Sequence, residues 1–186
     1  MLKKPDARRL SFMAVVIALA SVLIIIAGAF PFLSVAFATL SGAVLFVIGY
    51  EYGFKSGFLA FFLTLILTAI LAYDKEPVLY FAVLLGEYPG LKGVIETKCP
   101  KKTAAQYILK LITFNLAMAL IMILAYYFNP FSVEEITKIT SNLALVIIVF
   151  LGVGNAVFLV YDYALTGFIS YYIMKLSAEV RKRIKH

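Results

Sequence analysis

The chain has 186 residues, of which 63% are hydrophobic, with a mean hydropathy of +0.99 and a formal net charge of +7 at pH 7. Soluble globular domains contain about 45–50% apolar residues, so the composition predicts an all-α, polytopic membrane protein. Nucleic acid is not an expected partner, because the basic residues flank apolar segments and form no polar face. The single cysteine, Cys99, excludes an intramolecular disulfide and a cysteine-based metal cluster.

Six apolar segments follow one another, and we expect each to cross the lipid bilayer as a helix within a single integral membrane domain, residues 1–186. Their approximate ranges are 10–29, 32–48, 58–73, 78–96, 104–127 and 142–174. At 1.5 Å per residue the last segment is about 50 Å long, more than the ~30 Å hydrocarbon core. It must tilt, bend near Gly152, Gly154 or Gly167, or emerge into the cytoplasm.

Two connections carry local signals. Residues 49–57 are rich in glycine and tyrosine, which predicts a loop at the membrane interface between the second and third spans. Ser132 and Glu135 have the spacing of a capping box, which predicts a short surface helix before the last span.

The distribution of basic residues predicts the orientation. With six spans and a cytoplasmic N-terminus, only Lys75 and Lys138 of the 17 lysines and arginines fall outside. Lysine and arginine gather in cytoplasmic loops, so we expect both termini in the cytoplasm and the protein in the cell membrane.

The fourth span contains an interruption at residues 86–90. Pro89 has no backbone N–H and frees the carbonyl of Leu85, which a neighbour or an ordered water must then satisfy. Gly86, Gly90 and Gly93 share one face, on which we expect close approach of another helix.

Four ionisable residues fall in the central to inner part of the membrane: Glu87, Lys92, Lys110 and Asp162. Each costs about 2.5–3.5 kcal/mol to insert unless it is paired or hydrated. They indicate either an ion-coupled relay or polar ligand site, or a structural charge network, and we favour the network. We expect Asp162 to pair with Lys92 or Lys110, and Glu87 to point into the bundle towards a polar or basic partner.

Neutral polar and aromatic residues indicate where a small-molecule ligand would bind, in the outer half near the last three spans. The candidates are Tyr80, Asn115, Tyr126 and Asn142. Asn115 and Asn155 have a second interpretation, a hydrogen bond between helices. The sequence contains no metal-ligand spacing, catalytic motif or phosphate-binding loop, so neither an enzyme nor a cofactor is expected.

The first span carries small residues at helical spacing, including Ala14 and Ala18, which permit close packing either inside the protein, the interpretation that we favour, or against another subunit. The stretch RRLSFMAVVIALASV, the turn Phe30-Pro31-Phe32 and the stretch GYEYGFKSGFLAFFLTLI resemble the substrate-binding S component of energy-coupling-factor vitamin transporters. This resemblance implies six helices, a bound vitamin-like molecule, and a contact from Ala14 and Ala18 to a membrane-embedded coupling subunit that works with ATPases.

A second stretch, residues 86–92, is similar to a Gly-x-Tyr-Pro-x-x-Lys segment of uncharacterised, S-component-like firmicute membrane proteins. The size and layout also resemble the rod-shape-determining membrane proteins of the cell wall machinery. The sequence thus leaves two functions open: small-molecule uptake with a separate energising complex, and a structural or scaffolding membrane subunit. A polar cavity between the last three helices would separate them.

Overall fold

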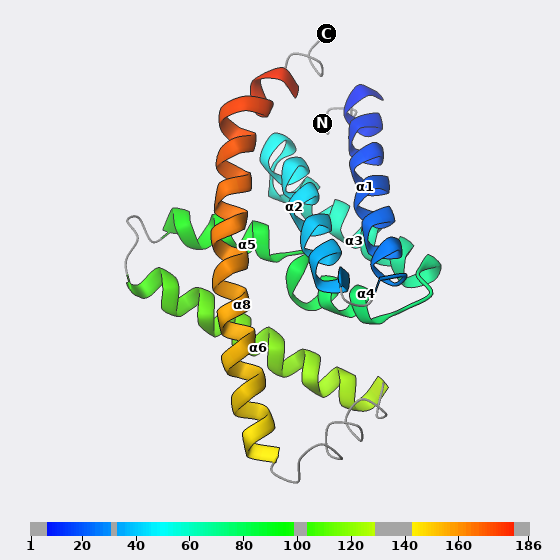
Figure 1. The fold of residues 1–186 in the computed structure, drawn as a ribbon. Coiled ribbons are helices and arrows are strands. Elements are labelled where there is room, and N and C mark those ends of the chain that lie inside the picture. The colour runs from blue at the N-terminus through cyan, green and yellow to red at the C-terminus, as the bar shows by residue number, and fades with distance from the viewer. Residues whose placement is uncertain (1–6, 31–32, 99–103, 129–142, 181–186) are drawn as a thin grey trace. The chain divides into compact units, whose positions relative to one another are not determined.

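The computed structural model describes residues 7–30, 33–98, 104–128 and 143–180 (Figure 1). Every regular element within these ranges is a helix, as the composition predicts. The elements are α1 (Ala7–Ala27), α2 (Ser34–Tyr52), α3 (Phe54–Leu71), α4 (Glu76–Tyr80), the π-helix η2 (Phe81–Leu85), α5 (Tyr88–Lys98), α6 (Ala104–Phe128), α8 (Leu143–Tyr171) and the π-helix η3 (Tyr172–Leu176).

Six helical segments are long and apolar enough to cross a membrane, so the predicted number of spans is confirmed. They are Ala7–Ala27, Ser34–Tyr52, Phe54–Leu71, Glu76–Glu96, Ala104–Leu124 and Leu151–Val180. The chain is therefore a multi-pass helical membrane protein. The cytoplasmic position of both termini stays a prediction, and the capping box at Ser132 and Glu135 lies outside the described residues.

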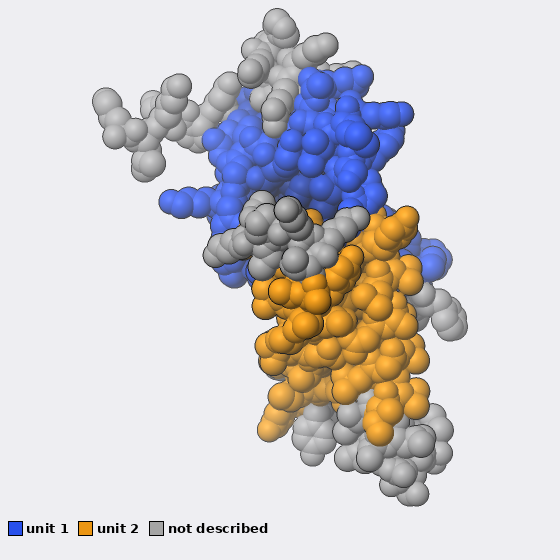
Figure 2. Space-filling model, turned by 90° about the vertical axis from the view of Figure 1, so that its left-hand side faces the viewer, with its two compact units in different colours: residues 1–93, 165–186 blue, residues 94–164 orange. Residues whose placement is uncertain are grey.

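The chain divides into two compact units, coloured separately in Figure 2. Unit 1 comprises Met1–Gly93 and Leu165–His186, and unit 2 comprises Val94–Ala164. That the two units act as one integral membrane domain stays a prediction.

Unit 1 is built on α1, α2 and α3, whose small side chains let the helices pack closely. Ala20, Ala38 and Ala60 are fully buried, one on each helix. The hydroxyl of Ser41, also fully buried, donates a 2.9 Å hydrogen bond to the carbonyl of Ala20. Without a large hydrophobic driving force in lipid, van der Waals contact and interhelical hydrogen bonds of this kind hold membrane helices together.

The predicted loop at residues 49–57 is wrong, because the helices extend through it. α2 ends at Tyr52 and α3 begins at Phe54, so Gly53 alone makes the turn, with a φ of 87° that only glycine adopts readily. The other two glycines serve packing: a Cβ built on Gly57 would lie 2.9 Å from the Cα of Gly49. The last turn of α2 and the first turn of α3 therefore touch backbone to backbone.

The fourth span breaks where the sequence predicts, at Gly86 and Glu87 between η2 and α5. Pro89 is the second residue of α5, where a helix does not use the missing N–H, so it begins a helix and does not kink one. The carbonyl of Leu85 lies against α2, and a Cβ built on Gly42 would be only 2.0 Å from its oxygen. Gly42 is thus the neighbour that lets this carbonyl approach another helix.

The predicted glycine face of this span is only partly used. A Cβ on Gly86 would lie 2.6 Å from the ring of Phe61, so α3 packs tightly here. Gly90 has one neighbour within 4 Å, the ring of Phe54 at 3.9 Å, and Gly93 has none. Close approach is limited to Gly86, where the Phe61 ring packs and where a Cβ built on Gly42 of α2 would lie 3.4 Å from the Gly86 Cα, so another helix does approach at this one glycine.

The last span stays α-helical through all three of its glycines and changes to π-helical hydrogen bonding at η3. The carboxylate of Glu51, near the end of α2, holds this segment: it accepts hydrogen bonds from the hydroxyls of Tyr172 at 3.1 Å and Ser177 at 2.9 Å. Both donors are buried, at 3% and 5% exposure. The π-helix η3 is therefore bound to α2 at both of its ends.

Candidate intramembrane polar site

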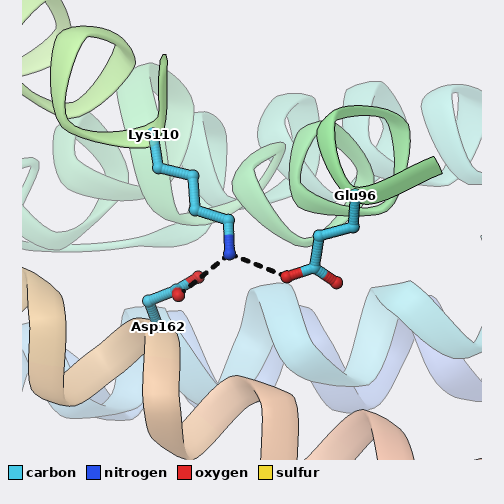
Figure 3. Close-up of polar contacts among 3 residues, drawn as sticks. All are labelled: Glu96, Lys110 and Asp162. Carbon is cyan, nitrogen blue, oxygen red and sulfur yellow. Dashed lines mark hydrogen bonds and ion pairs between the residues drawn. The ribbon is translucent and has the colours of Figure 1, made fainter. Parts of the chain in front are cut away.

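The centre of the site is Lys110, whose ammonium group lies between two carboxylates in unit 2 (Figure 3). Its Nζ is 2.7 Å from Oε1 of Glu96 and 3.0 Å from Oδ2 of Asp162. The three side chains come from α5, α6 and α8, so a single cation joins three helices.

The three groups differ in exposure. The side chains of Lys110 and Asp162 are 6% and 12% exposed, whereas that of Glu96 is 39% exposed. Removing charges from water costs several kcal/mol per ion, which pairing and hydrogen bonding offset. The Lys110–Asp162 bond is therefore the buried part of the cluster, and Glu96 connects it to the surface. Of the two pairings expected for Asp162, the one with Lys110 is present.

α6 and α8 face each other in antiparallel register beyond this ion pair. One turn along α6, the ring of Phe114 stacks on Phe158 with centroids 4.4 Å apart and an interplanar angle of 19°. A further turn along, a Cβ built on Gly154 would be 3.4 Å from Met118. Residues four apart on α6 thus meet residues four apart on α8, which is the spacing that places side chains on one helix face.

Asn115 and Asn155 form a reciprocal amide pair beside the Phe114–Phe158 stack. Each Nδ2 donates to the Oδ1 of the other residue, at 3.1 and 3.0 Å. Each Nδ2 also donates at 2.8 Å to the carbonyl four residues earlier on its own helix, Leu111 or Leu151. Both hydrogens of both amides are used, so the structure has the interhelical bond that was one of two interpretations of these residues.

The other predicted ligand residues are only partly described. The hydroxyl of Tyr80 donates to Oε1 of Glu76, one turn earlier in the same span. Tyr126 lies in the last turn of α6, and Asn142 lies outside the described residues. A ligand site shared by Tyr80, Asn115, Tyr126 and Asn142 stays a prediction.

Two of the predicted charged residues, Lys92 and Glu87, belong to unit 1. Lys92 is 1% exposed and therefore part of the packed interior. Glu87 is half-buried, and its carboxylate makes no ion pair or side-chain hydrogen bond with any residue that the structure describes. The expected polar or basic partner of Glu87 is therefore not found within the described ranges.

Glu96 is the residue that the sequence interpretation missed. Its place at the predicted end of the fourth span does not suggest a partner for an internal charge. A usable signal was present: the connection to α6 is short, which makes α5 and α6 close neighbours. Basic residues also stand before and after that connection in the sequence, at Lys98 and Lys110.

Ala14 and Ala18 are exposed on α1, while Val16, Ile17 and Ala20 form its buried face. Packing of these two alanines inside the protein, the interpretation favoured from the sequence, is therefore not what the described chain shows. Among the described residues, no group of histidine, cysteine, aspartate and glutamate side chains is placed to hold a metal ion.

Comparisons with protein-family models, with characterised proteins and with solved structures gave no match. The fold thus defines the class, a multi-pass helical membrane protein, and function has to be inferred from the residues themselves.

Proposed function

We propose that this protein is an S-component-like membrane subunit that binds a vitamin-like small molecule from outside the cell and delivers it with a separate energising complex. It lies in the cell membrane with both termini in the cytoplasm, and it interacts with a membrane-embedded coupling subunit and its ATPases. The chain has no nucleotide-binding motif of its own to drive uptake.

The observation that carries this proposal is the exposure of Ala14 and Ala18 on α1. Small residues four apart let two membrane helices approach closely, and no described helix of this chain covers them. A helix of a partner subunit can pack closely against this face. This agrees with the role that the resemblance assigns to these alanines.

The ligand side of the proposal rests on the neutral polar groups of α6 and α8. Asn115 and Asn155 place two amide groups, each with a donor nitrogen and an acceptor oxygen, in two helices that are otherwise strongly apolar. A polar ligand can replace their mutual hydrogen bonds, because each amide keeps its bond to its own helix.

The test is affinity purification in mild detergent from cells that express the tagged protein at native levels, followed by mass spectrometry of bound proteins and small molecules. We expect ATPase and coupling subunits with the wild type, and their loss with Ala14→Leu/Ala18→Leu. The matched control is Ala36→Leu, which enlarges another exposed alanine, on α2. Equal recovery of partners with all three proteins, or none with the wild type, would contradict the proposal.

A second function, a structural or scaffolding membrane subunit, is favoured by a different observation. The hydrogen-bonding groups of Asn115, Asn155 and Lys110 are already engaged within unit 2. Polar groups that satisfy one another need no ligand. Recovery of other membrane proteins without ATPases or a small molecule would select this function.

A further inference from the structure

Glu87 is an acidic residue of the fourth span. It lies next to the midpoint of that span, Glu76–Glu96, in the turn between η2 and α5. Its neighbours Gly86, Tyr88 and Pro89 are buried, whereas Glu87 keeps partial exposure. The carboxyl group therefore lies at the edge of a packed segment, and its place near the midpoint of the span predicts a depth at which lipid surrounds the protein.

The charged groups on the elements packed against this segment are engaged elsewhere or are exposed to solvent. On α2, Glu51 is held by Tyr172 and Ser177. On α4, Glu76 accepts from Tyr80, and just before it Lys75 donates to the carbonyls of Ala69 and Ala72.

Two further charges lie in this region. Asp74, just before α4, accepts a hydrogen bond from the backbone N–H of Glu76 at 2.9 Å. Lys55, at the start of α3, is exposed to solvent and makes no ion pair or hydrogen bond with another described residue. On the segment itself Lys92 is buried, and no interaction joins it to Glu87. Glu87 thus has no counter-charge among the residues that the structure describes.

A carboxylate in this position has two influences acting on it. The start of α5 favours negative charge, but that effect is small and confined to the first turn. The apolar surroundings disfavour the charge by considerably more. Ionisable residues inside membrane spans mark ion and proton pathways, and a carboxyl group without a partner avoids the cost of a charge in apolar surroundings by taking up a proton.

We propose that Glu87 is a proton-binding site within the membrane, with its carboxyl group protonated at neutral pH. Loss of the proton places an unpaired charge beside the η2–α5 turn. The carbonyl of Leu85, at the end of η2, packs against Gly42 of α2. A charge on Glu87 in the following turn would therefore disturb the packing of η2 against α2. The inference does not depend on small-molecule uptake.

The test is infrared difference spectroscopy of the full-length protein in lipid bilayers, comparing wild type with Glu87→Gln across a pH titration. We expect a carbonyl-stretch band of a protonated carboxylic acid at pH 7 that is absent from the variant and shifts in heavy water. A carboxylate band at pH 7 in its place would overturn the proposal. The matched control, Glu76→Gln, changes an exposed carboxyl at the end of the same span and should remove a carboxylate band.

A second measurement covers the case in which Glu87→Gln does not fold. Dicyclohexylcarbodiimide, a lipid-soluble reagent, adds to protonated carboxyl groups in membranes. We expect it to modify Glu87 in the wild-type protein, as mapped by peptide mass spectrometry, and to abolish the same infrared band. If the band survives complete modification of Glu87, it belongs to another group and the proposal fails.

Discussion

Replacing Asp162 by asparagine tests the energetics of the buried ion pair. Asp162 and Lys110 have 12% and 6% exposed side chains and lie 3.0 Å apart. Breaking a buried pair costs about 3–5 kcal/mol because one charge is left uncompensated. Glu96 still contacts Lys110 at 2.7 Å, so we expect the lower end of that range, about 3 kcal/mol of unfolding free energy.

The double mutant decides whether this loss comes from the pair. Lys110→Met combined with Asp162→Asn removes both buried charges and should recover most of the loss, giving an interaction energy of about 1–3 kcal/mol. Glu96→Gln is the matched control: its carboxylate is 39% exposed, and such pairs contribute about 0–1 kcal/mol.

The assay is unfolding by sodium dodecyl sulfate in mixed micelles, followed by circular dichroism. Additive losses in the double mutant would refute the reasoning, as would a Glu96→Gln loss equal to that of Asp162→Asn.

Two other predictions concern helix packing, measured in the same assay. Gly42→Ala should lower the free energy of unfolding by more than about 2 kcal/mol, because its Cβ would lie 2.0 Å from the Leu85 oxygen. Gly93→Ala is the matched control: nothing lies within 4 Å of its Cβ position, so the free energy of unfolding should not change. Equal effects of the two substitutions would contradict the contact. The Asn115–Asn155 pair should show an interaction energy of about 0.6 kcal/mol in a double-mutant cycle with alanine, and a value near zero would mean that the amides do not bond across the helices in the membrane.

The fold was predictable to the extent that it depends on hydrophobic length. Six long apolar segments specify six spans regardless of how the helices pack. The ends of the helices were harder to predict. The glycines at positions 49 and 57 have the character of turn residues, yet both lie inside helices and allow close packing. Turn formation and close approach both favour glycine, so the residue type alone does not separate them.

For the candidate site, the sequence predicted how deep each charged residue lies in the membrane, but not which residues contact one another. The sequence places Lys110 and Asp162 at similar depth, and the structure pairs them. It does not show which way each helix faces, so Glu96 was missed and a partner was expected for Glu87. Facing is decided by tertiary packing, here by the antiparallel register in which Phe114 and Asn115 meet Phe158 and Asn155.

The measurement that tests the account most directly is cysteine accessibility in intact cells, with Cys99 replaced by serine. Tyr73, fully exposed after α3, and Lys55, exposed at the start of α3, each receive a single cysteine. With six spans and a cytoplasmic N-terminus, a membrane-impermeant maleimide should label position 73 in intact cells and position 55 only after permeabilisation. Labelling of position 55 from outside would contradict the orientation, the depth assigned to every charged residue, and the uptake of a ligand from outside.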